Sequence, residues 1–255
     1  MTTALVTGAS AGIGAEFARQ LASRGNDLVL VARDATRLQA LADELTAAHG
    51  IRAEVLPADL TDRAATQRVC DRLADEADPV DILVNNAGFG LKGSFLGNDI
   101  ADEEAGLDVM VRAVLLTCHA AGRAMRARGR GQIINVSSVA GWITSGTYSA
   151  EKSFVTVFTE GLSVQLQGTG VTATAVAPGF THTEFHERAE LPMGWLPDWA
   201  WLSASELVSG ALDDAAKGKA ISVPGRQWKA VATLARIAPR PLVRSRRISM
   251  QHRRR

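Results

Sequence analysis

Short apolar runs alternate with amphipathic stretches along almost the whole chain of 255 residues. The apolar runs are rich in Val, Ile and Leu, as fully buried parallel strands are. The stretches between them have helical periodicity, and four of them end beside a glycine that suits a helix C-terminus. The pattern predicts strands at 4–7, 27–32, 53–56, 82–85, 132–136, 171–176 and 220–223, and helices at 14–24, 35–49, 62–77, 103–128, 148–167 and 204–217.

This regular alternation predicts an α/β fold, with one doubly wound sheet of seven parallel strands and helices on both faces. We expect one domain over residues 1–225, followed by a basic C-terminal extension over residues 226–255. The chain shows no internal repeat and no low-complexity linker, which favours a single folded unit.

Residues 180–203 interrupt the alternation between the sixth predicted strand and the helix that follows. They carry three of the five tryptophans and follow the carboxyl end of a strand, where open α/β sheets bind ligands. We interpret the segment as a substrate lid, and its aromatic content predicts an apolar substrate. The alternative is a local apolar cluster that only packs on the core.

The composition points to a soluble globular protein, because apolar residues make up 46% and charged residues 22% of the chain. No apolar run approaches the ~20 residues that span a bilayer, so we expect no transmembrane segment and no secretory signal. Cys70 and Cys118 stand alone, which indicates reduced thiols in a cytoplasmic protein. His182 and His186 are four residues apart but lack a third ligand, so we predict no metal site.

The net charge of +1 conceals a strong segregation of charge. Residues 215–255 contain twelve Lys and Arg residues and no Asp or Glu, whereas residues 1–214 contain sixteen against twenty-seven. The basic end could attract the phosphates of nucleic acid or anionic lipid. Because residues 244–255 lack aromatic side chains, we expect a solvated tail with weak contact to anionic surfaces and no specific nucleic-acid partner.

A glycine-rich turn, Thr7-Gly-Ala-Ser-Ala-Gly-Ile-Gly14, follows the first predicted strand and leads into a helix. Its three glycines permit a tight turn and close approach of a ligand to the backbone. The free N–H groups at the start of the helix favour a pyrophosphate. We therefore predict dinucleotide binding here rather than a purely structural turn.

The end of the second predicted strand discriminates between two dinucleotides. Arg33 stands where a guanidinium group would bind the 2′-phosphate of NADP(H), whereas an acidic residue there would select NAD(H). The next residue, Asp34, either caps the following helix, which we favour, or moderates the preference towards dual use. The sequence therefore predicts NADP(H) as the preferred cofactor.

The only tyrosine of the chain, Tyr148, stands four residues before Lys152. On a helix these positions share one face, so the Lys152 ammonium group can stabilise an ionised phenol. We expect the pKa of Tyr148 to lie below its usual ~10 and the residue to act as an acid/base. Glu151, within this stretch, either pairs with Lys152 or faces solvent.

Six motifs in this order resemble those of the short-chain dehydrogenase/reductase family, over nearly the whole chain to about residue 225. They are Thr7 to Gly14, Asp59, Asn85-Asn86-Ala87-Gly88, Asn135 to Ser138, Tyr148 to Lys152, and Pro178-Gly179 with Thr183. The resemblance implies a Rossmann fold and, with Arg33, the subgroup that prefers NADP.

The resemblance also implies catalytic roles for Ser138, Tyr148 and Lys152. Tyr148 would protonate a carbonyl oxygen or deprotonate the alcohol in reverse, Lys152 would hold the nicotinamide ribose and lower the pKa of the phenol, and Ser138 would bond the substrate oxygen. The cofactor-binding residues implied are Gly8, Ser10, Gly12, Ile13, Gly14, Arg33, Asp59, Leu60, Asn86, Ala87, Gly88, Tyr148, Lys152, Pro178, Gly179 and Thr183. Among these, Asp59 would touch the adenine, Asn86 would support the pocket near the adenosine ribose, and Thr183 would contact the carboxamide.

Two departures from the family pattern bear on activity. Met110 occupies the position of a helical asparagine that helps to hold a proton-relaying water, and a thioether offers no donor. The sequence leaves impaired and unaffected catalysis equally open at this point.

The second departure is the spacing of ten residues from Ser138 to Tyr148, where the family more often has twelve or thirteen. We expect Trp142 and Ile143 to line a compact pocket mouth. Ser138 remains the expected catalytic serine, with Ser137 or Ser145 as alternatives.

Together these features predict an NADP(H)-dependent oxidoreductase that reduces a carbonyl group of an apolar small molecule, or oxidises the corresponding secondary alcohol. The alternative, motivated by Met110, is a catalytically impaired member that acts as a sensor or scaffold. The resemblance implies a homodimer or homotetramer assembled through helices 103–128 and 148–167. The basic end or the amphipathic stretch 228–243 could instead block one interface.

Overall fold

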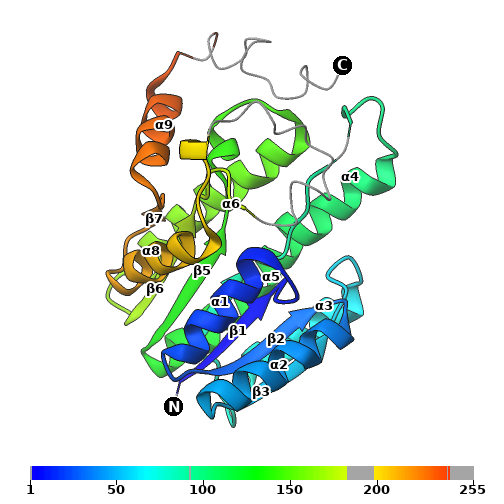
Figure 1. Ribbon diagram of the computed structural model, residues 1–255, viewed down its shortest axis with the longest axis vertical. Helices are drawn as coiled ribbons and strands as arrows, with labels where there is room; N and C mark the ends of the chain where they lie inside the picture. The colour runs from blue at the N-terminus through cyan, green and yellow to red at the C-terminus, as the bar shows by residue number, and fades with distance from the viewer. Residues whose placement is uncertain (1, 92, 183–197, 240, 242–255) are drawn as a thin grey trace.

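The computed structural model describes residues 2–91, 93–182, 198–239 and 241. Within them the chain forms one sheet of parallel strands in the order β3-β2-β1-β4-β5-β6-β7 (Figure 1). The predicted fold class and strands are confirmed, and strand ends differ from the prediction by one residue at most. The strands are β1 (Thr3–Thr7), β2 (Asp27–Ala32), β3 (Ala53–Pro57), β4 (Ile82–Asn85), β5 (Gly131–Val136), β6 (Val171–Val176) and β7 (Ile221–Ser222).

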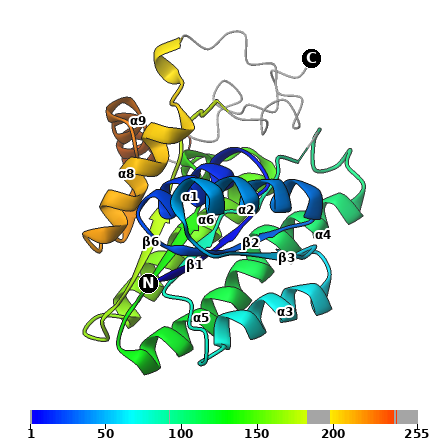
Figure 2. The ribbon, with the colours of Figure 1, turned by 60° about the horizontal axis from the view of Figure 1, so that its bottom comes forward.

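Helices cover both faces of this sheet, as Figure 2 shows. They are α1 (Gly12–Ser23), α2 (Ala35–His49), α3 (Arg63–Ala74), α4 (Ile100–Leu107), α5 (Ala113–Arg128), α6 (Gly146–Gln165), α8 (Ala204–Ala216) and α9 (Arg226–Ile237). The described residues also form the π turn η1 (Asp108–Arg112) and the 3₁₀ turns η2 (Val139–Trp142) and η3 (Asp198–Ala200). α1, α2 and α8 pack on one face, and α3, α5 and α6 on the other.

Two apolar layers hold the sheet between its helices. Because side chains alternate along a strand, Val6 points into the layer with Phe17 of α1, whereas Leu5 points into the layer with Val114 of α5. Val6 pairs with Leu30 of β2 on one side and with β4 on the other. The chain therefore runs outward from β1 to β3 and returns beside β1, which creates a switch point at the carboxyl ends of β1 and β4.

The helix predicted at 103–128 differs most from the prediction. It begins three residues earlier, at Ile100, because the Asp99 carboxylate caps it by accepting a hydrogen bond from the Ala101 N–H at 3.0 Å. It is also interrupted by the π turn η1, which separates α4 from α5. The helix predicted at 62–77 ends earlier, at Ala74.

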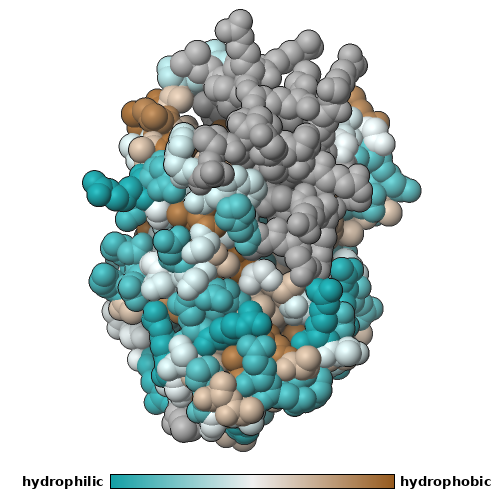
Figure 3. Space-filling model, viewed as in Figure 1, coloured by the Kyte–Doolittle hydropathy of each residue, from teal (hydrophilic) through white to brown (hydrophobic). Residues whose placement is uncertain are grey.

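The continuous helical run Ile100–Arg128 is long and apolar enough to cross a membrane by length and composition, although we expected no such segment. Half of its most apolar window is buried inside the protein, and Cys118 and Met125 belong to the core layer below the sheet. These contacts are those of a core helix. On the face shown in Figure 3, polar side chains cover much of the described surface and apolar ones form small patches.

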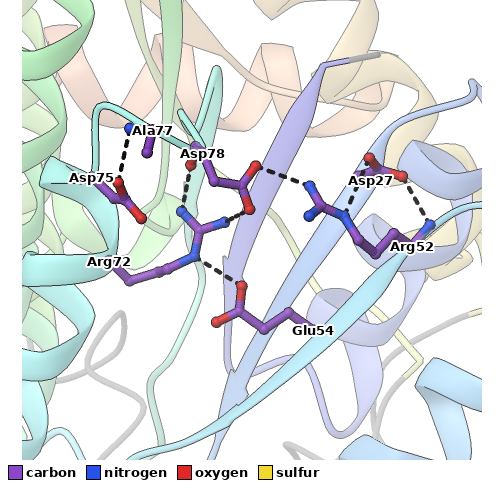
Figure 4. A network of polar contacts seen from close by, with 7 residues as sticks. All are labelled: Asp27, Arg52, Glu54, Arg72, Asp75, Ala77 and Asp78. Carbon is purple, nitrogen blue, oxygen red and sulfur yellow. Dashed lines mark hydrogen bonds and ion pairs between the residues drawn. The ribbon is translucent and has the colours of Figure 1, made fainter.

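The amino-terminal edge of the sheet carries a network of ion pairs (Figure 4). The Arg72 guanidinium group bonds to Glu54 at 2.8 Å and to Asp78 at 3.0 Å. Arg52 bonds to the same Asp78 at 2.9 Å and lies 3.7 Å from Asp27. Hydrogen bonds from Arg52 hold the pKa of Asp78 below its usual value. The carboxylates of Asp27, Glu54 and Asp78 therefore each face a guanidinium group.

Candidate active site at the carboxyl edge of the sheet

The glycine-rich turn lies at the carboxyl end of β1, where α1 begins. Gly8 and Gly12 have φ of +66° and +56°, a conformation that favours glycine. A Cβ atom on Gly14 would lie 2.2 Å from the Gly8 carbonyl oxygen, so only glycine fits there. The first turn of α1 contains no acidic residue, and Ala11 makes no side-chain cap, so its N–H groups are available to an anion.

Side chains from the end of β4 support this turn. The Asn86 amide donates to the carbonyl oxygens of Thr7 at 3.0 Å and Gly8 at 3.3 Å. The Thr7 hydroxyl oxygen accepts from the backbone N–H groups of Asn86 at 3.0 Å and Ala87 at 3.1 Å. These bonds tie the glycine-rich turn to the β4 motif and fix the shape of the expected dinucleotide cradle. Of the other residues implied there, Ser10 and Ile13 are half-buried in the turn and Leu60 is buried in the core.

Arg33 is exposed directly after β2, where the 2′-phosphate of NADP(H) is predicted to bind. Burial raises the pKa of the Asp59 carboxyl group, but the hydrogen bonds from Thr61, together with the weaker effect of the Arg33 charge, outweigh it and hold that pKa below its usual value. Asp34 accepts a hydrogen bond from the Arg37 N–H at 3.0 Å and caps α2, as we favoured. The Asp34 carboxylate is thus committed to the helix, and Arg33 remains available to a phosphate.

Ser138, Tyr148 and Lys152 come together beyond the carboxyl end of β5. The Nζ atom of Lys152 lies 5.7 Å from the centroid of the Tyr148 ring, one turn away on α6. The same ammonium group donates to the Val136 carbonyl oxygen at 2.9 Å. The Ser138 hydroxyl group forms a hydrogen bond with the Tyr148 phenol. The three residues expected to be catalytic therefore form one cluster.

The expectation that Tyr148 has a pKa below 10 is contradicted by the surroundings of its phenol group. Burial raises the pKa of Tyr148 to about 12, and the negative charge of Glu151 adds to the rise, while the Ser138 hydrogen bond opposes it. Burial also lowers the pKa of Lys152 to about 8, against the attraction of Glu151. The phenol is therefore protonated at neutral pH.

The contacts of three serines distinguish the expected catalytic serine from its alternatives. The Ser137 hydroxyl is buried and donates to the Lys152 carbonyl oxygen at 2.7 Å, also contacting Thr156 Oγ1 at 2.7 Å. It is therefore occupied in the core. Ser145 precedes α6 and makes no side-chain cap. Ser138, which also accepts from the Ala140 N–H at 3.1 Å, remains the residue that bonds the phenol.

Met110 lies in the π turn and is fully buried. A Cβ atom on Gly88 would lie 3.2 Å from the Met110 sulfur and 3.5 Å from Lys152 Nζ, so the thioether and the ammonium group meet at this glycine. The sulfur supplies no donor beside the lysine. Its effect on turnover stays a prediction.

Trp142, which we expected to line the pocket mouth, contacts the C-terminal helix α9. The Arg236 guanidinium carbon of α9 lies 5.7 Å from the centroid of the Trp142 ring, as in a cation–π contact. This contact turns at least one face of the indole towards the C-terminal helix, because η2 and α9 lie against each other.

The expected lid at 180–203 falls largely outside the described residues, including Thr183 and His186. Its two ends lie side by side: Leu202 N–H donates to the Phe180 carbonyl oxygen at 2.9 Å, and the His182 ring stacks on Trp201 at 4.4 Å. Trp228 of α9 meets Phe180 edge-on at 5.3 Å. In the described part of the chain no group of three His, Cys, Asp or Glu residues could hold a metal ion.

Trp228 also fixes the turn after β6. A Cβ atom on Gly179 would lie 2.0 Å from the Trp228 ring, so the residue expected to contact the cofactor must remain glycine to seat the indole. Pro178 accepts a hydrogen bond from the Val139 N–H at 3.0 Å, which joins this turn to the cluster after β5.

Two carboxyl groups near the cluster were not predicted as site residues. Glu151 is only 1% exposed, which excludes the solvent-facing alternative for this residue, and Glu103 of α4 is 3% exposed. A signal for Glu151 exists in the sequence, because it shares a helix face with Tyr148 and Val155 at spacings of three and four.

The chain matches the family described as short chain dehydrogenases over residues 2–192. It therefore belongs to the short-chain dehydrogenase/reductase family, whose members are oxidoreductases. The resemblance stated from the motifs is confirmed.

Three similar proteins extend this match. A short-chain dehydrogenase from Sphingobium yanoikuyae in complex with NADPH is 35% identical, with a TM-score of 0.85 over 91% of this chain and 93% of that one. An uncharacterised oxidoreductase of Myxococcus xanthus is 37% identical over 94% of each chain. The bulky-bulky ketone specific alcohol dehydrogenase from Comamonas testosteroni is 30% identical, with a TM-score of 0.80 over 91% of each chain.

Proposed function

We propose that this protein reduces a carbonyl group of an apolar small molecule with NADPH, or oxidises the corresponding secondary alcohol with NADP⁺. The observation that carries the proposal is the cluster of Ser138, Tyr148 and Lys152 at the carboxyl edge of the sheet. This cluster lies one strand away from the motif that supports the glycine-rich turn, because β5 neighbours β4. An acid/base group and a dinucleotide cradle therefore share one edge.

The cofactor is NADP(H). The residues fit it, since the α1 N-terminus is open, Gly14 leaves no room for a side chain, and exposed Arg33 can bind a 2′-phosphate. The Sphingobium relative, which was solved with NADPH, supports the choice. Asn86 and the β4 motif would hold the cradle in shape, and Thr183 remains a proposed contact from the sequence alone.

When bound, NADPH supplies the hydride that reduces the carbonyl carbon. Tyr148 gives the proton to the carbonyl oxygen, and its high pKa of about 12 means that it holds this proton at neutral pH. Ser138 donates a hydrogen bond to the oxygen as negative charge develops there. Lys152, fixed by the Val136 carbonyl oxygen, stabilises the phenolate left behind.

Aromatic side chains support an apolar substrate. Phe180, Trp201 and Trp228 form a cluster at the two ends of the proposed lid, next to the turn that carries Gly179. The Comamonas relative is specific for bulky ketones, which favours the same class of substrate here. We propose residues 180–203 as the segment that covers the substrate.

Exposed apolar side chains support assembly into a homodimer or homotetramer. Leu107 and Leu115, on the α4–α5 run, are 46% and 45% exposed, and Val157 and Val164 of α6 are 65% and 62% exposed. Burying such side chains against a second copy is favourable. The two buried free thiols, Cys70 and Cys118, support a reducing, cytoplasmic location.

The test is oxidation of NADPH with a panel of bulky apolar ketones and aldehydes. We expect Tyr148→Phe to lower kcat by about 10² to 10⁴ and Ser138→Ala by about 10² to 10³, while NADPH binding persists. Ser145→Ala is the matched control and retains activity. Tight NADPH binding without turnover on the whole panel would contradict the proposal and favour a sensor, and restored turnover in Met110→Asn would strengthen that alternative.

A further inference from the structure

Two buried carboxyl groups face the contact between α4 and α6, next to the residues proposed as catalytic. Glu151 belongs to α6 and Glu103 to α4, and both are almost completely buried. Gly106 makes room for the Glu151 side chain, because a Cβ atom there would lie 2.6 Å from Glu151 Oε1. Any larger residue at position 106 would displace the Glu151 carboxyl group.

These carboxyl groups lack the partners that buried carboxylates normally have. Asn98 Nδ2 donates to Glu103 Oε1 at 2.7 Å. Glu103 Oε2 and both oxygens of Glu151 are buried without a hydrogen-bond partner among the described residues. An ionised carboxyl group in this condition is unfavourable unless a proton or a nearby cation compensates it.

Among the described residues, few charged groups lie around Glu151. On its own helix it interacts with Lys152 and Tyr148, and on α4 with Glu103. On the neighbouring turn η1, Asp108 and Arg112 bond to each other at 2.6 Å. The other elements packed against α6 contribute no Asp, Glu, Lys or His from η2, β5 or β6, and Arg236 of α9 lies at Glu160, 4.0 Å away.

We propose that the Glu151 carboxyl group, buried without a hydrogen-bond partner in the contact between α4 and α6, takes up a proton near neutral pH, and that its negative charge, once this proton is lost, keeps the buried Lys152 amine protonated beside Tyr148. Glu151 is a positioning residue in this arrangement, since it acts through Lys152 and does not bond the phenol. Glu103, buried on the neighbouring helix α4, repels a second negative charge, so the protonated form of Glu151 is favoured. The consequence for catalysis rests on the proposed function, whereas the charge state does not.

The direction of each pKa shift agrees with this arrangement. Burial raises the pKa of Glu151 to about 7, with Lys152 opposing the rise and Glu103 adding to it. Burial lowers the pKa of Lys152 to about 8, and the charge of Glu151 limits that fall. Removing the Glu151 charge should therefore let the Lys152 amine lose its proton at a lower pH.

The primary test follows Lys152 directly by NMR of isotope-labelled lysine side chains, of which the chain has five. The wild-type Lys152 signal should titrate near pH 8, and its transition should move to lower pH in Glu151→Gln. Glu151→Asp, which keeps a negative charge, should restore much of the wild-type transition. Glu104→Gln removes the exposed neighbour of Glu103 and should change nothing. An unmoved Lys152 transition in a folded Glu151→Gln variant overturns the proposal.

Infrared titration tests the proton on Glu151. The wild-type protein should show the carbonyl stretch of a protonated carboxyl group that disappears near pH 7. The band should be lost in Glu151→Gln and should titrate at lower pH in Glu103→Gln, because the repulsion is removed. A wild-type protein without this band near neutral pH contradicts a proton on Glu151.

The catalytic consequence is read from the pH profile of kcat/KM with NADPH. Its alkaline limb should shift to lower pH in Glu151→Gln and stay in place in Glu104→Gln. A protein without turnover on the ketone panel would defeat the proposed function, yet the NMR and infrared titrations would still decide the charge state. Turnover with an unshifted limb would instead overturn the role of Glu151 in catalysis.

Discussion

The two edges of the parallel sheet treat charge in opposite ways. At the amino edge, Arg52 and Arg72 connect three carboxylates through ion pairs that are exposed to water on at least one side. At the carboxyl edge, Lys152 and Glu151 are 5% and 1% exposed, and the Glu151 carboxyl group has no hydrogen bond among the described residues. The charged groups at the amino edge of the sheet therefore have partners of opposite charge, whereas the Glu151 carboxyl group at the carboxyl edge is buried without a hydrogen bond among the described residues.

The two edges also differ in the direction in which they shift the pKa values of their charged groups. Charges at the amino edge have shifts that favour their ionised forms, as the lowered pKa of Asp78 demonstrates. Charges at the carboxyl edge are shifted towards neutrality by burial, as both Glu151 and Lys152 demonstrate. The first arrangement stabilises the folded chain, whereas the second brings acid and base groups into the neutral pH range.

The largest effect is expected from Gly14→Ala at the carboxyl edge. The new methyl group would collide with the Gly8 carbonyl oxygen, so NADPH affinity should fall by roughly 100-fold or more and stability by about 1 to 3 kcal/mol. Calorimetric titration with NADPH and thermal unfolding measure both. Gly210→Ala on α8 is the control: a Cβ atom there would lie 3.6 Å from Pro224, an ordinary van der Waals contact, so NADPH affinity should not change. Equal losses in the two variants would show that the turn is not a special site.

Arg33→Ala tests whether the exposed guanidinium group at this edge binds the 2′-phosphate of NADPH. A lost charge-assisted contact to the 2′-phosphate should weaken NADPH binding by roughly 10- to 100-fold and leave NADH binding unchanged. Arg37→Ala, one turn away beside Asp34 at 3.6 Å, is the matched control. A parallel loss for both dinucleotides would assign Arg33 to the fold and not to cofactor choice.

Glu151→Gln should stabilise the protein at pH 8, by about 1 to 2 kcal/mol. The folded-state pKa of Glu151 is raised to about 7 from 4.5, so the stability that its proton confers is present below pH 4.5 and is lost as pH rises to 7. The neutral amide avoids this loss, and the gain should vanish near pH 5. Denaturant unfolding at the two pH values provides the measurement, and a gain that does not depend on pH would exclude the buried-charge explanation.

The smallest effects are expected at the amino edge. Arg72→Met should cost about 1 kcal/mol of unfolding free energy, because its side chain is 12% exposed and bonds two carboxylates. Arg52→Met should cost less, because this side chain is 62% exposed and exposed ion pairs contribute little to stability. Neither change should alter NADPH affinity. A lower NADPH affinity in either variant would show that the amino edge also contributes to cofactor binding, contrary to this prediction.

Much of the fold could be predicted from the sequence, because local signals and tertiary packing agree. The apolar runs of β1 to β7 are buried as strands, and Gly50, at φ +66°, ends α2 as the pattern indicated. Asp34 caps the same helix by the mechanism that its position suggests. At these places one residue type satisfies both the local conformation and the core.

The remaining features depend on contacts between distant segments. The π turn at Asp108–Arg112 has no local sequence signal that we recognised, and Trp142 contacts a helix that begins more than eighty residues later. The pKa of Tyr148 was predicted in the wrong direction because a helical spacing shows the neighbouring cation but not the burial of the phenol. Desolvation is a property of the whole packed site.

The indole of Trp228 has a consequence for anyone who recombines this protein with its relatives. Its ring occupies the space that a side chain at Gly179 would need, and its Nε1 donates to the Ala200 carbonyl oxygen at 3.1 Å. Through Trp228, the C-terminal helix α9 is packed against both the turn after β6 and the chain before α8, so the three segments must fit one another. A chimera that exchanges the C-terminal helix must therefore bring a compatible turn with it, so the natural crossover point lies before Pro178 and not at the start of the basic extension.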